Sequence, residues 1–452
     1  MDEPIMAGSY DDHIEFLRSH PKLLSEKVSG LAFHNVGYYI ALWNANERQY
    51  HLLGDKVMAI GTPFHTRTSE LNTSLAWKHW SGYFVANHYD DFWEPEYQAV
   101  RNGAALIDVS PLYKYDIRGR DAVRLLDRLI TRNAAKIKVG QVIYTPWCDD
   151  NGKVLQDGTV QRLSESLYRL ASVDPCLHWF EDNKFGLDVE LEDVTERMGA
   201  LALQGPRSLD VMNRISSNDM STLRFFGVTD TALDGVPVVV SRTGYTGDLG
   251  YEIWVGVNEA ERLWDALIEA GKGHYLVPAG MQALDLARIE AGFPLIDVDF
   301  WNGENTLIDD QKSSPFEIGL GWTVNLKKSN YVGKQALAEE KRVGTQRLFV
   351  GLEVSWKEIE RIYTEEGLPP EPSQEASRVG VPIYFGGRQV GKATSSCWSK
   401  LLKKFIALSS VDAPYAKPGS MVDLEITVEY KRKRAAAKVV QLPFFDPPRK
   451  RA

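Results

Sequence analysis

The chain has 452 residues, of which 44% are hydrophobic and 25% are charged, and its formal net charge is −9 at pH 7. This length predicts two to four domains, the composition is ordinary for a folded globular protein, and the negative charge argues against nonspecific binding to nucleic acid. Three widely spaced cysteines exclude a disulfide framework, and the lack of a long apolar run or a signal-like N-terminus predicts a cytoplasmic protein without a membrane span.

The first half of the chain alternates between helix-like and hairpin-like patterns. We predict a helix at 11–24, a hairpin at 37–60, a helix that leads into a strand at 89–110, an amphipathic helix at 120–131 and a hairpin at 140–163. The last of these has Asn151-Gly152 at its tip, which is a strong hairpin signal.

Further helices are predicted at 258–271 and 279–292, with a short strand between them. The pattern breaks near 338–346, and short strands separated by Gly and Pro then predict a small C-terminal β domain. Within that domain, the charged stretch 356–377 is predicted to be an exposed insertion.

The stretch "SRTGYTGDLGYEIW" (241–254) contains an unusual acidic residue. Its glycines, between two runs of strand-forming residues, predict a hairpin with a glycine-rich loop. Glu252 follows on the second strand, with no basic neighbour in sequence. Glutamate is rarely buried without a partner, so Glu252 either faces water or lies against a specific donor.

Several common chemistries are missing from the sequence. It contains no phosphate-binding P-loop, no glycine fingerprint of a dinucleotide site, no paired histidine spacing for a metal and no serine nucleophile elbow. We therefore predict no metal site.

Ordered segments of the chain resemble the tetrahydrofolate-dependent T-protein (aminomethyltransferase) family of the glycine cleavage system. The segments that carry the resemblance are "EYQAVRNGAALIDVSPLYKYDIRG", "GKVLQDGTV", "LALQGPRSLDVM", "RTGYTGDLGYEIW", "AGMQALDLARIEAGFPL", "SPFEIGLGWTVNLKKSNYVGKQAL" and "GVPIYFGGRQVGKATSS". The resemblance covers about Gly61 to Phe445 and implies an α+β fold of three domains around a central folate channel, with a C-terminal small β-barrel. The implied boundaries are 1–58 for an N-terminal extension, 59–337 for the folate-binding domains and 338–452 for the barrel domain.

The resemblance also implies how tetrahydrofolate is bound. The carboxylate of Glu252 would accept two N–H donors of the pterin ring in a bidentate contact, and Tyr245 would line the site. Gly244 would let the backbone approach the flat cofactor closely, and Arg288 would belong to the cofactor site. Gln156, Asp157 and Tyr245 are the candidate catalytic residues.

Two positions depart from the family pattern. Gln156 stands where the family carries an Asp, and Leu284 stands where it carries an Arg that contacts folate. Successive residues on a strand face opposite sides, so the neighbouring Asp157 is not expected to substitute for the missing carboxylate.

These departures favour relatives of the family that demethylate other donors. The main expectation is a one-carbon transferase that moves a methyl or methylene-level carbon from an N-, S- or O-methylated small molecule to tetrahydrofolate, with poor activity toward an aminomethyl-lipoyl donor. The alternatives are the glycine cleavage aminomethyltransferase, with a lipoyl carrier protein as partner, and a noncatalytic folate-binding regulator. Residues 1–58 are expected either to shape the donor entrance or to stabilise a homodimer.

Overall fold

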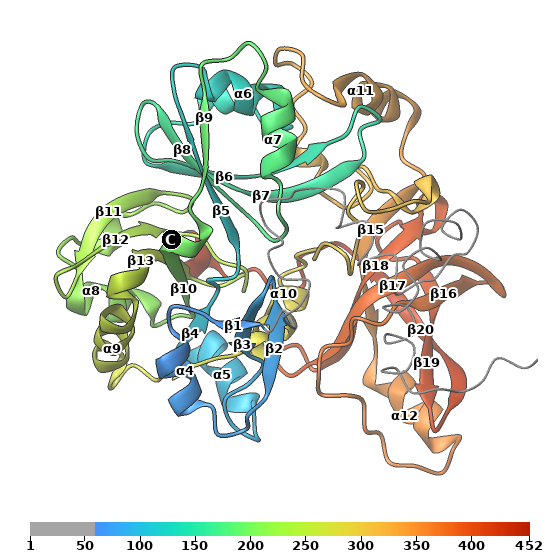
Figure 1. Cartoon of the computed structure of the whole chain (residues 1–452). Helices are drawn as coiled ribbons and strands as arrows, with labels where there is room; N and C mark the ends of the chain where they lie inside the picture. Colours follow the sequence, from blue (N-terminus) through green and yellow to red (C-terminus); the bar gives the residue numbers. More distant parts are fainter. Residues whose placement is uncertain (1–58) are drawn as a thin grey trace, which may run out of the picture. The chain divides into compact units, whose positions relative to one another are not determined.

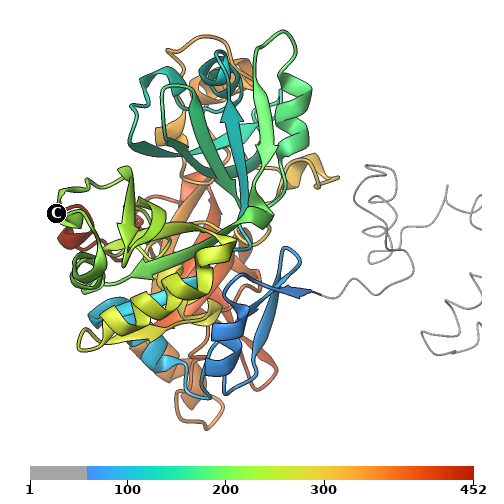
Figure 2. The ribbon, with the colours of Figure 1, turned by 60° about the vertical axis from the view of Figure 1, so that its left-hand side comes forward.

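The computed structural model describes residues 59–452, which form one compact unit. The predicted helix at 11–24 and nearly all of the predicted hairpin at 37–60 lie outside the described residues. The described part contains two large sheets, a closed barrel and a small sheet, with helices packed around them (Figures 1 and 2).

The first large sheet has six strands in the order β11-β12-β13-β10-β4-β14. Its strands are β4 (Ala104–Asp108), β10 (Met198–Gln204), β11 (Val228–Leu233), β12 (Val236–Ser241), β13 (Gly250–Gly256) and β14 (Leu276–Pro278). The accompanying helices are α5 (Glu94–Asn102), α8 (Ser208–Ile215), α9 (Ala260–Gly271) and α10 (Met281–Glu290). The predicted helix-to-strand unit at 89–110, the two later helices and the strand between them are therefore confirmed.

The second large sheet has five strands in the order β6-β7-β8-β5-β9. They are β5 (Tyr113–Arg118), β6 (Gln141–Cys148), β7 (Val154–Arg162), β8 (Leu167–Ser172) and β9 (Glu190–Asp193), covered by α6 (Ala122–Leu129) and α7 (Leu177–Asn183). The predicted hairpin is β6–β7, and Gly152 at its tip has φ 73°, a value that favours glycine. The amphipathic helix predicted at 120–131 is α6, whose Leu125, Leu126 and Leu129 are fully buried.

A small sheet precedes these two and contains β1 (Ile60–Gly61), β2 (Trp77–Trp80) and β3 (Tyr83–Ala86) in the order β1-β3-β2, with α4 (His65–Leu71) beside it. The turn of the β2–β3 hairpin reaches the second large sheet, because Ser81 Oγ donates to the carbonyl of Val173 just after β8 (3.3 Å).

The C-terminal β domain is a closed six-stranded barrel, as predicted. Its strands are β15 (Arg347–Val354), β16 (Val381–Phe385), β17 (Arg388–Ser399), β18 (Lys404–Asp412), β19 (Met421–Val428) and β20 (Lys431–Val440). Side chains of α10 and the barrel strands β17 and β18 share one buried cluster, so the barrel packs directly against α10.

One prediction about this region needs correction. The stretch predicted as an exposed insertion begins with helix α12 (Trp356–Thr364), whose Ile359 and Ile362 are buried in the barrel core, because their i, i+3 spacing gives the charged helix one apolar face. Helix α11 (Lys334–Val343) runs across the predicted boundary at 337/338, and Leu337 is fully buried against residues that precede the barrel. We propose that the boundary lies after this helix, at Gly344.

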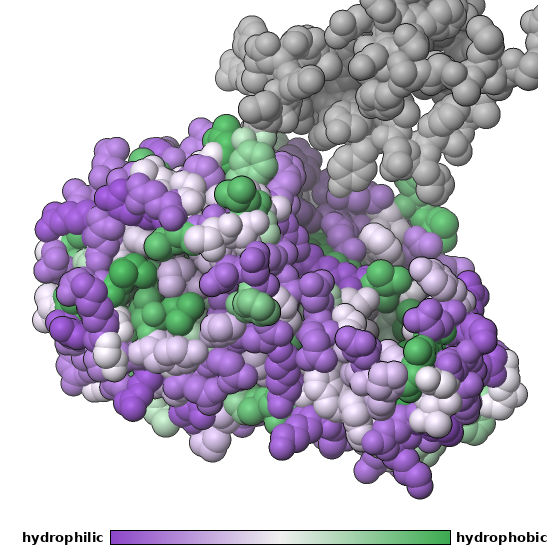
Figure 3. All heavy atoms as spheres, turned by 90° about the horizontal axis from the view of Figure 1, so that it is seen from below, coloured by the Kyte–Doolittle hydropathy of each residue, from purple (hydrophilic) through white to green (hydrophobic). Residues whose placement is uncertain are grey.

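The surface of the described part is mixed in hydropathy. Figure 3 shows one face on which hydrophilic residues predominate and hydrophobic residues occur in small groups. No helix within residues 59–452 is both long enough and apolar enough to cross a membrane.

Candidate functional site

Glu252 lies on β13, in the middle of the six-stranded sheet. Its Cα is paired with Ser241 on β12 and with Ala202 on β10. The hydroxyl of Thr243, at the start of the glycine-rich loop, donates to Glu252 Oε2 at 2.5 Å, and the hydroxyls of Ser241 and Thr243 are 2.7 Å apart. The hairpin predicted around this loop is confirmed, and its first strand and loop supply the hydroxyls beside the carboxylate.

The surroundings of Glu252, as far as residues 59–452 form them, contain no compensating charge. Burial raises the pKa of Glu252, and the hydroxyls of Thr243 and Ser241 only partly oppose this rise. Within residues 59–452, no Lys, Arg or His forms an ion pair with the carboxylate. A desolvated carboxylate with spare acceptor capacity fits a ligand that offers neighbouring N–H donors, as a pterin ring does.

Tyr245 borders the same side of the sheet. Glu252 and Trp254 are two residues apart on β13 and so face one side, and Tyr245 packs against the buried cluster that contains Trp254. The Tyr245 hydroxyl donates to the carbonyl of Pro294 at 2.6 Å, and its ring stacks on Phe293 with 5.6 Å between centroids. Burial raises the pKa of Tyr245, so the phenol keeps its proton and this geometry favours a lining role over proton transfer.

Asp157 lies on β7 beside the hydroxyl of a second tyrosine. The Tyr144 hydroxyl donates to Asp157 Oδ2. Burial raises the pKa of Asp157 to about 6, the Tyr144 hydrogen bond opposes the rise, and the nearby Asp174 carboxylate adds to it. Asp157 also contributes to the raised pKa values of both Tyr144 and Tyr245.

Gln156, next to Asp157 on the strand, points elsewhere. It is 2% exposed, and its Oε1 accepts from the backbone N–H of Asp157 at 3.2 Å. The amide lies beside Asp174, where it opposes the rise in the pKa of that carboxyl. The sequence correctly predicts opposite directions for the two side chains, but Asp157 is the one that reaches the tyrosines. Which of the two residues acts in catalysis stays a prediction.

Arg288 is held by several contacts within the protein. It lies on α10 with 0% exposure, and its guanidinium donates to Asp285 Oδ1 (2.7 Å), Asp299 Oδ2 (2.5 Å) and Ser395 Oγ (2.8 Å). Since Ser395 belongs to β17, these bonds tie α10 to the barrel. The contacts give Arg288 a structural role, and its membership of the cofactor site stays a prediction.

Leu284, on the same helix, is 7% exposed and belongs to the buried apolar cluster that contains Trp254. This environment favours the interpretation of Leu284 as a core residue, because a lone Arg there would be a buried charge that needs a partner.

Gly244 is required by a packing contact within the protein. A Cβ at Gly244 would lie 2.0 Å from Gln204 Oε1, and a Cβ at Gly250 would lie 2.4 Å from the same side chain. Gln204 is fully buried, and its Nε2 donates to the carbonyls of Thr243 and Tyr251. The close approach that demands glycine is therefore to Gln204, and a cofactor contact by Gly244 stays a prediction.

We expect Gly244→Ala to lower the free energy of unfolding by about 1–3 kcal/mol, because the new methyl group must displace a buried amide. Urea denaturation measures the loss, and the same substitution in a Gln204→Ala background should cost under about 1 kcal/mol. An equal loss in both backgrounds, together with weaker tetrahydrofolate binding, would instead favour a direct role of Gly244 at the cofactor.

Sequence reasoning missed Tyr144 and Thr243 as members of the site. The β6–β7 register shifts at a β-bulge between the turn and Asp157, and the shifted register pairs Asp157 with Pro146 and puts Tyr144 two residues away on the same face. The bulge has no marker in the sequence, so the Asn-Gly turn alone could not predict this pairing. No local pattern marks Thr243, because its role depends on the pairing of β12 with β13.

Comparisons with known proteins agree with this arrangement of sheets, loop and barrel. The model of the GCVT N-terminal domain matches residues 64–328, and that of the glycine cleavage T-protein C-terminal barrel domain matches residues 367–446. An aminomethyltransferase of Halothermothrix orenii is 34% identical over 388 residues, covering 85% of this chain and 99% of the relative. One from Alkaliphilus oremlandii is 33% identical over 355 residues, covering 77% and 88%.

The fold is shared with a solved protein as well. The crystal structure of the glycine cleavage system aminomethyltransferase T from Bartonella henselae superposes with a TM-score of 0.73 at 22% identity, covering 86% of this chain and 98% of that one. The two sheets, the barrel and the site define a folate-dependent one-carbon transferase with the three-domain T-protein fold. The chain belongs to the glycine cleavage T-protein family.

The class determines the cofactor, tetrahydrofolate. The carboxylate of Glu252 fits this cofactor, because it can accept hydrogen bonds from the N–H groups of a pterin ring. Over the part of the chain that the structure describes, no group of three or more His, Cys, Asp or Glu side chains could hold a metal ion.

Proposed function

We propose that this chain is a tetrahydrofolate-dependent aminomethyltransferase that takes its one-carbon unit from an aminomethyl group on a lipoyl carrier protein. The observation that carries the proposal is Asp157, a buried acid with a pKa of about 6 that is hydrogen-bonded to Tyr144 and close to Tyr245. Curated relatives named aminomethyltransferase, one of them aligned over 99% of its length, support the same function.

The residues near Asp157 suit proton transfer between two nitrogen groups. When bound, tetrahydrofolate supplies N5 as the acceptor of the one-carbon unit. A carboxyl with a pKa of about 6 is mostly ionised at neutral pH and can take up a proton, then return it to a departing amine. The hydroxyl of Tyr144 fixes the orientation of the carboxylate, and Glu252 fixes the position of the cofactor.

A second candidate is the transfer of carbon from an N-, S- or O-methylated small molecule. Gln156, a buried neutral amide, and Leu284, in an apolar cluster, are the observations that favour a changed donor. The two candidate functions share the cofactor site and differ only in the one-carbon donor that binds beside Asp157.

The test compares both donors on one enzyme. We expect purified protein, tetrahydrofolate and an aminomethyl-loaded lipoyl carrier to release ammonia and form methylene-tetrahydrofolate with saturation kinetics. A panel of methylamine, methylsulfonium and methoxy-aromatic compounds serves as the competing arm. Turnover confined to a member of the panel would replace the proposal with the second candidate, and tetrahydrofolate binding without any turnover would favour a folate-binding regulator.

The variant Gln156→Asp provides a separate measurement on the same assay. Because Gln156 faces away from Tyr144 and Tyr245, we expect kcat with the aminomethyl donor to change less than about threefold. A gain of tenfold or more would show that position 156 participates in the transfer after all.

A further inference from the structure

The last described residues, 443–452, lie beside the glycine-rich loop 242–249, and we call this segment the strap. Arg449 in the strap makes a bidentate contact with the loop: its Nε donates to Asp248 Oδ1 at 2.7 Å, and its Nη2 donates to Asp248 Oδ2 at 2.8 Å. The chain end marked in Figure 1 lies beside β12 and β13, the two strands that the loop connects. A segment that is distant in sequence is therefore attached to the loop that carries Tyr245.

The Asp248 carboxylate is fully buried and faces two arginines. Besides the contact with Arg449, its Oδ2 lies 3.6 Å from Arg101 Nη1. The Arg101 guanidinium also donates to the carbonyl of Thr246 in the loop at 3.0 Å and to Glu290 Oε2 at 2.7 Å. Arg101 is therefore divided among two carboxylates and the loop backbone, while Arg449 gives Asp248 a bidentate contact of its own.

Two further contacts join the strap to the loop and to the ring beside Tyr245. The carbonyl of Ala452 accepts from the guanidinium of Arg242, in the first position of the loop. Lys450 Nζ lies 5.0 Å from the ring centroid of Phe293, and this ring stacks on that of Tyr245. The Lys450 side chain is largely buried, so water screens its contact with the ring only weakly. The strap therefore contacts both ends of the loop and the ring that supports its tyrosine.

We propose that Arg449 is a positioning residue for tetrahydrofolate binding. It fixes the loop in the conformation in which Thr243 donates to Glu252 and Tyr245 is stacked beside the site. Arg449 acts through Asp248 and is not itself a contact of the cofactor. The inference goes beyond the proposed function, because it concerns the cofactor side of the site and holds for either one-carbon donor.

The expected effect follows from the shared use of Arg101. Among the described residues, Arg101 is the one remaining cation near the buried Asp248 carboxylate when Arg449 is removed. A buried charge that loses a partner is costly, so Arg101 should move toward Asp248 and release the carbonyl of Thr246. The loop then samples more conformations, and tetrahydrofolate must order it at a cost in binding free energy.

The first experiment measures tetrahydrofolate binding to the full chain by calorimetry, together with steady-state kinetics. For Arg449→Gln we expect Kd and KM for tetrahydrofolate to rise about 5–10-fold while kcat stays within about twofold, because an ordered loop stabilises the bound ground state and the transition state alike. Arg449→Lys keeps the charge but not the bidentate geometry, so it should raise Kd only about threefold. A purely structural Arg449 would lower the free energy of unfolding and leave Kd unchanged, which would overturn the proposal.

Hydrogen exchange tests the loop itself. Without cofactor, the amides of 243–249 should exchange about fivefold faster in Arg449→Gln than in the wild type, while those of α6, in the other large sheet, stay unchanged. Because coupling between two sites is reciprocal, tetrahydrofolate should slow the exchange of strap residues 445–451 in the wild type and not in Arg449→Gln.

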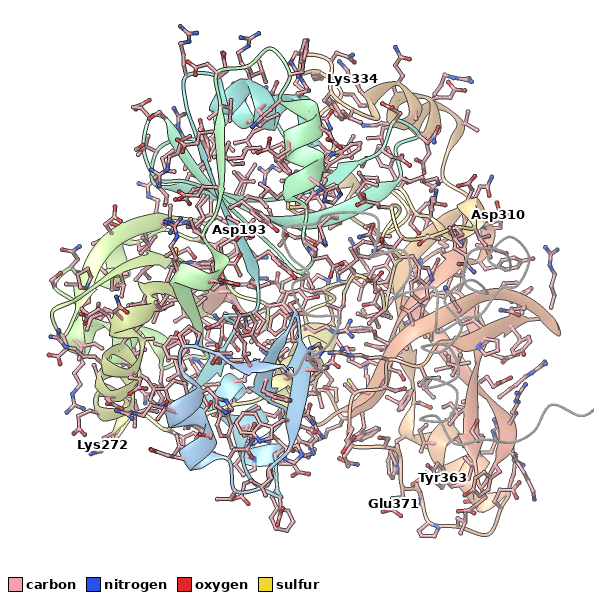
Figure 4. All side chains as sticks on the ribbon, in the orientation of Figure 1. Asp193, Lys272, Asp310, Lys334, Tyr363 and Glu371 are labelled. Carbon is pink, nitrogen blue, oxygen red and sulfur yellow. The ribbon has the colours of Figure 1, made fainter. Side chains whose placement is uncertain are left out.

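Lys272→Gln is the matched control. Lys272, labelled in Figure 4, follows α9 and forms an exposed ion pair with Glu269, with 2.5 Å between Nζ and Oε2. Loss of this cation should change neither the Kd of tetrahydrofolate nor the exchange of the loop. Unchanged loop exchange in Arg449→Gln, or faster loop exchange with an unchanged Kd, would overturn the proposal. Both outcomes leave the proposed function standing, because neither measurement involves the one-carbon donor.

Discussion

Replacement of Asp157 by Asn should lower kcat about 10²–10⁴-fold, while tetrahydrofolate affinity stays within about twofold. The amide keeps the size of the carboxylate and its contact with Tyr144, but it cannot take up or return a proton. Steady-state kinetics with the aminomethyl carrier, together with equilibrium binding of the cofactor, separates the two quantities.

The pH dependence has a definite sign. Because the pKa of Asp157 is raised to about 6, the base is active above this value, and kcat should fall tenfold per pH unit well below it.

The raised pKa of Asp157 also affects stability. Between about pH 4 and pH 6, Asp157 holds a proton in the folded protein that it has released in the unfolded chain. The contribution of Asp157 to stability is therefore fully present below about pH 4 and is lost as pH rises through 6. Asp157→Asn should therefore be at least as stable as the wild type at pH 7.5.

The matched variant is Tyr144→Phe, which removes only the hydroxyl that orients the carboxylate. We expect a loss in kcat of about tenfold and a shift of the acid limb to higher pH, because the hydrogen bond of Tyr144 lowers the pKa of Asp157. An Asp157→Asn protein that turns over within threefold of the wild type would remove Asp157 from the mechanism.

Glu252→Gln should weaken tetrahydrofolate binding about 10–150-fold, which corresponds to about 1.5–3 kcal/mol for a lost charge-assisted contact. The amide retains one acceptor oxygen and presents an N–H₂ group where the ligand also presents donors. Because Thr243 already donates to Oε2, the other carboxylate oxygen, Oε1, has more acceptor capacity left for the cofactor. Calorimetry on wild type and variant measures the difference.

Glu190→Gln serves as the charge-matched control, because Glu190 is exposed at the start of β9. It should bind tetrahydrofolate as the wild type does. Equal affinity in Glu252→Gln and wild type would place the pterin elsewhere. In the wild type, binding should also weaken as pH falls through the raised pKa of Glu252, because the protonated carboxyl accepts fewer hydrogen bonds.

Local sequence pattern was sufficient for most of the elements. The Asn-Gly turn predicted the β6–β7 hairpin, the spacing of apolar residues predicted α6, α9 and α10, and the Gly- and Pro-punctuated strands predicted the barrel. These predictions succeed because helix periodicity and turn chemistry are properties of residues a few positions apart. The family resemblance rested on the same short segments.

The candidate site was predicted less completely. The alternation of side chains along β7 showed that Gln156 and Asp157 point to opposite faces of the sheet. The sequence does not show which residues of other segments lie on each face. Tyr144 lies 13 positions from its partner Asp157 and across a hairpin. The choice between the two residues therefore depended on the paired strand.

The sequence by itself determined which elements form and that one glutamate on β13 lacks a basic neighbour. Only the tertiary structure decided the roles of the other polar residues of the protein. Arg288 meets Ser395 across 107 positions, and the loop glycine at 244 is required by Gln204 at the end of β10. The physical reason is that burial and hydrogen-bond partners, which set the role of a polar side chain, come from segments that are distant in the chain and adjacent only after folding.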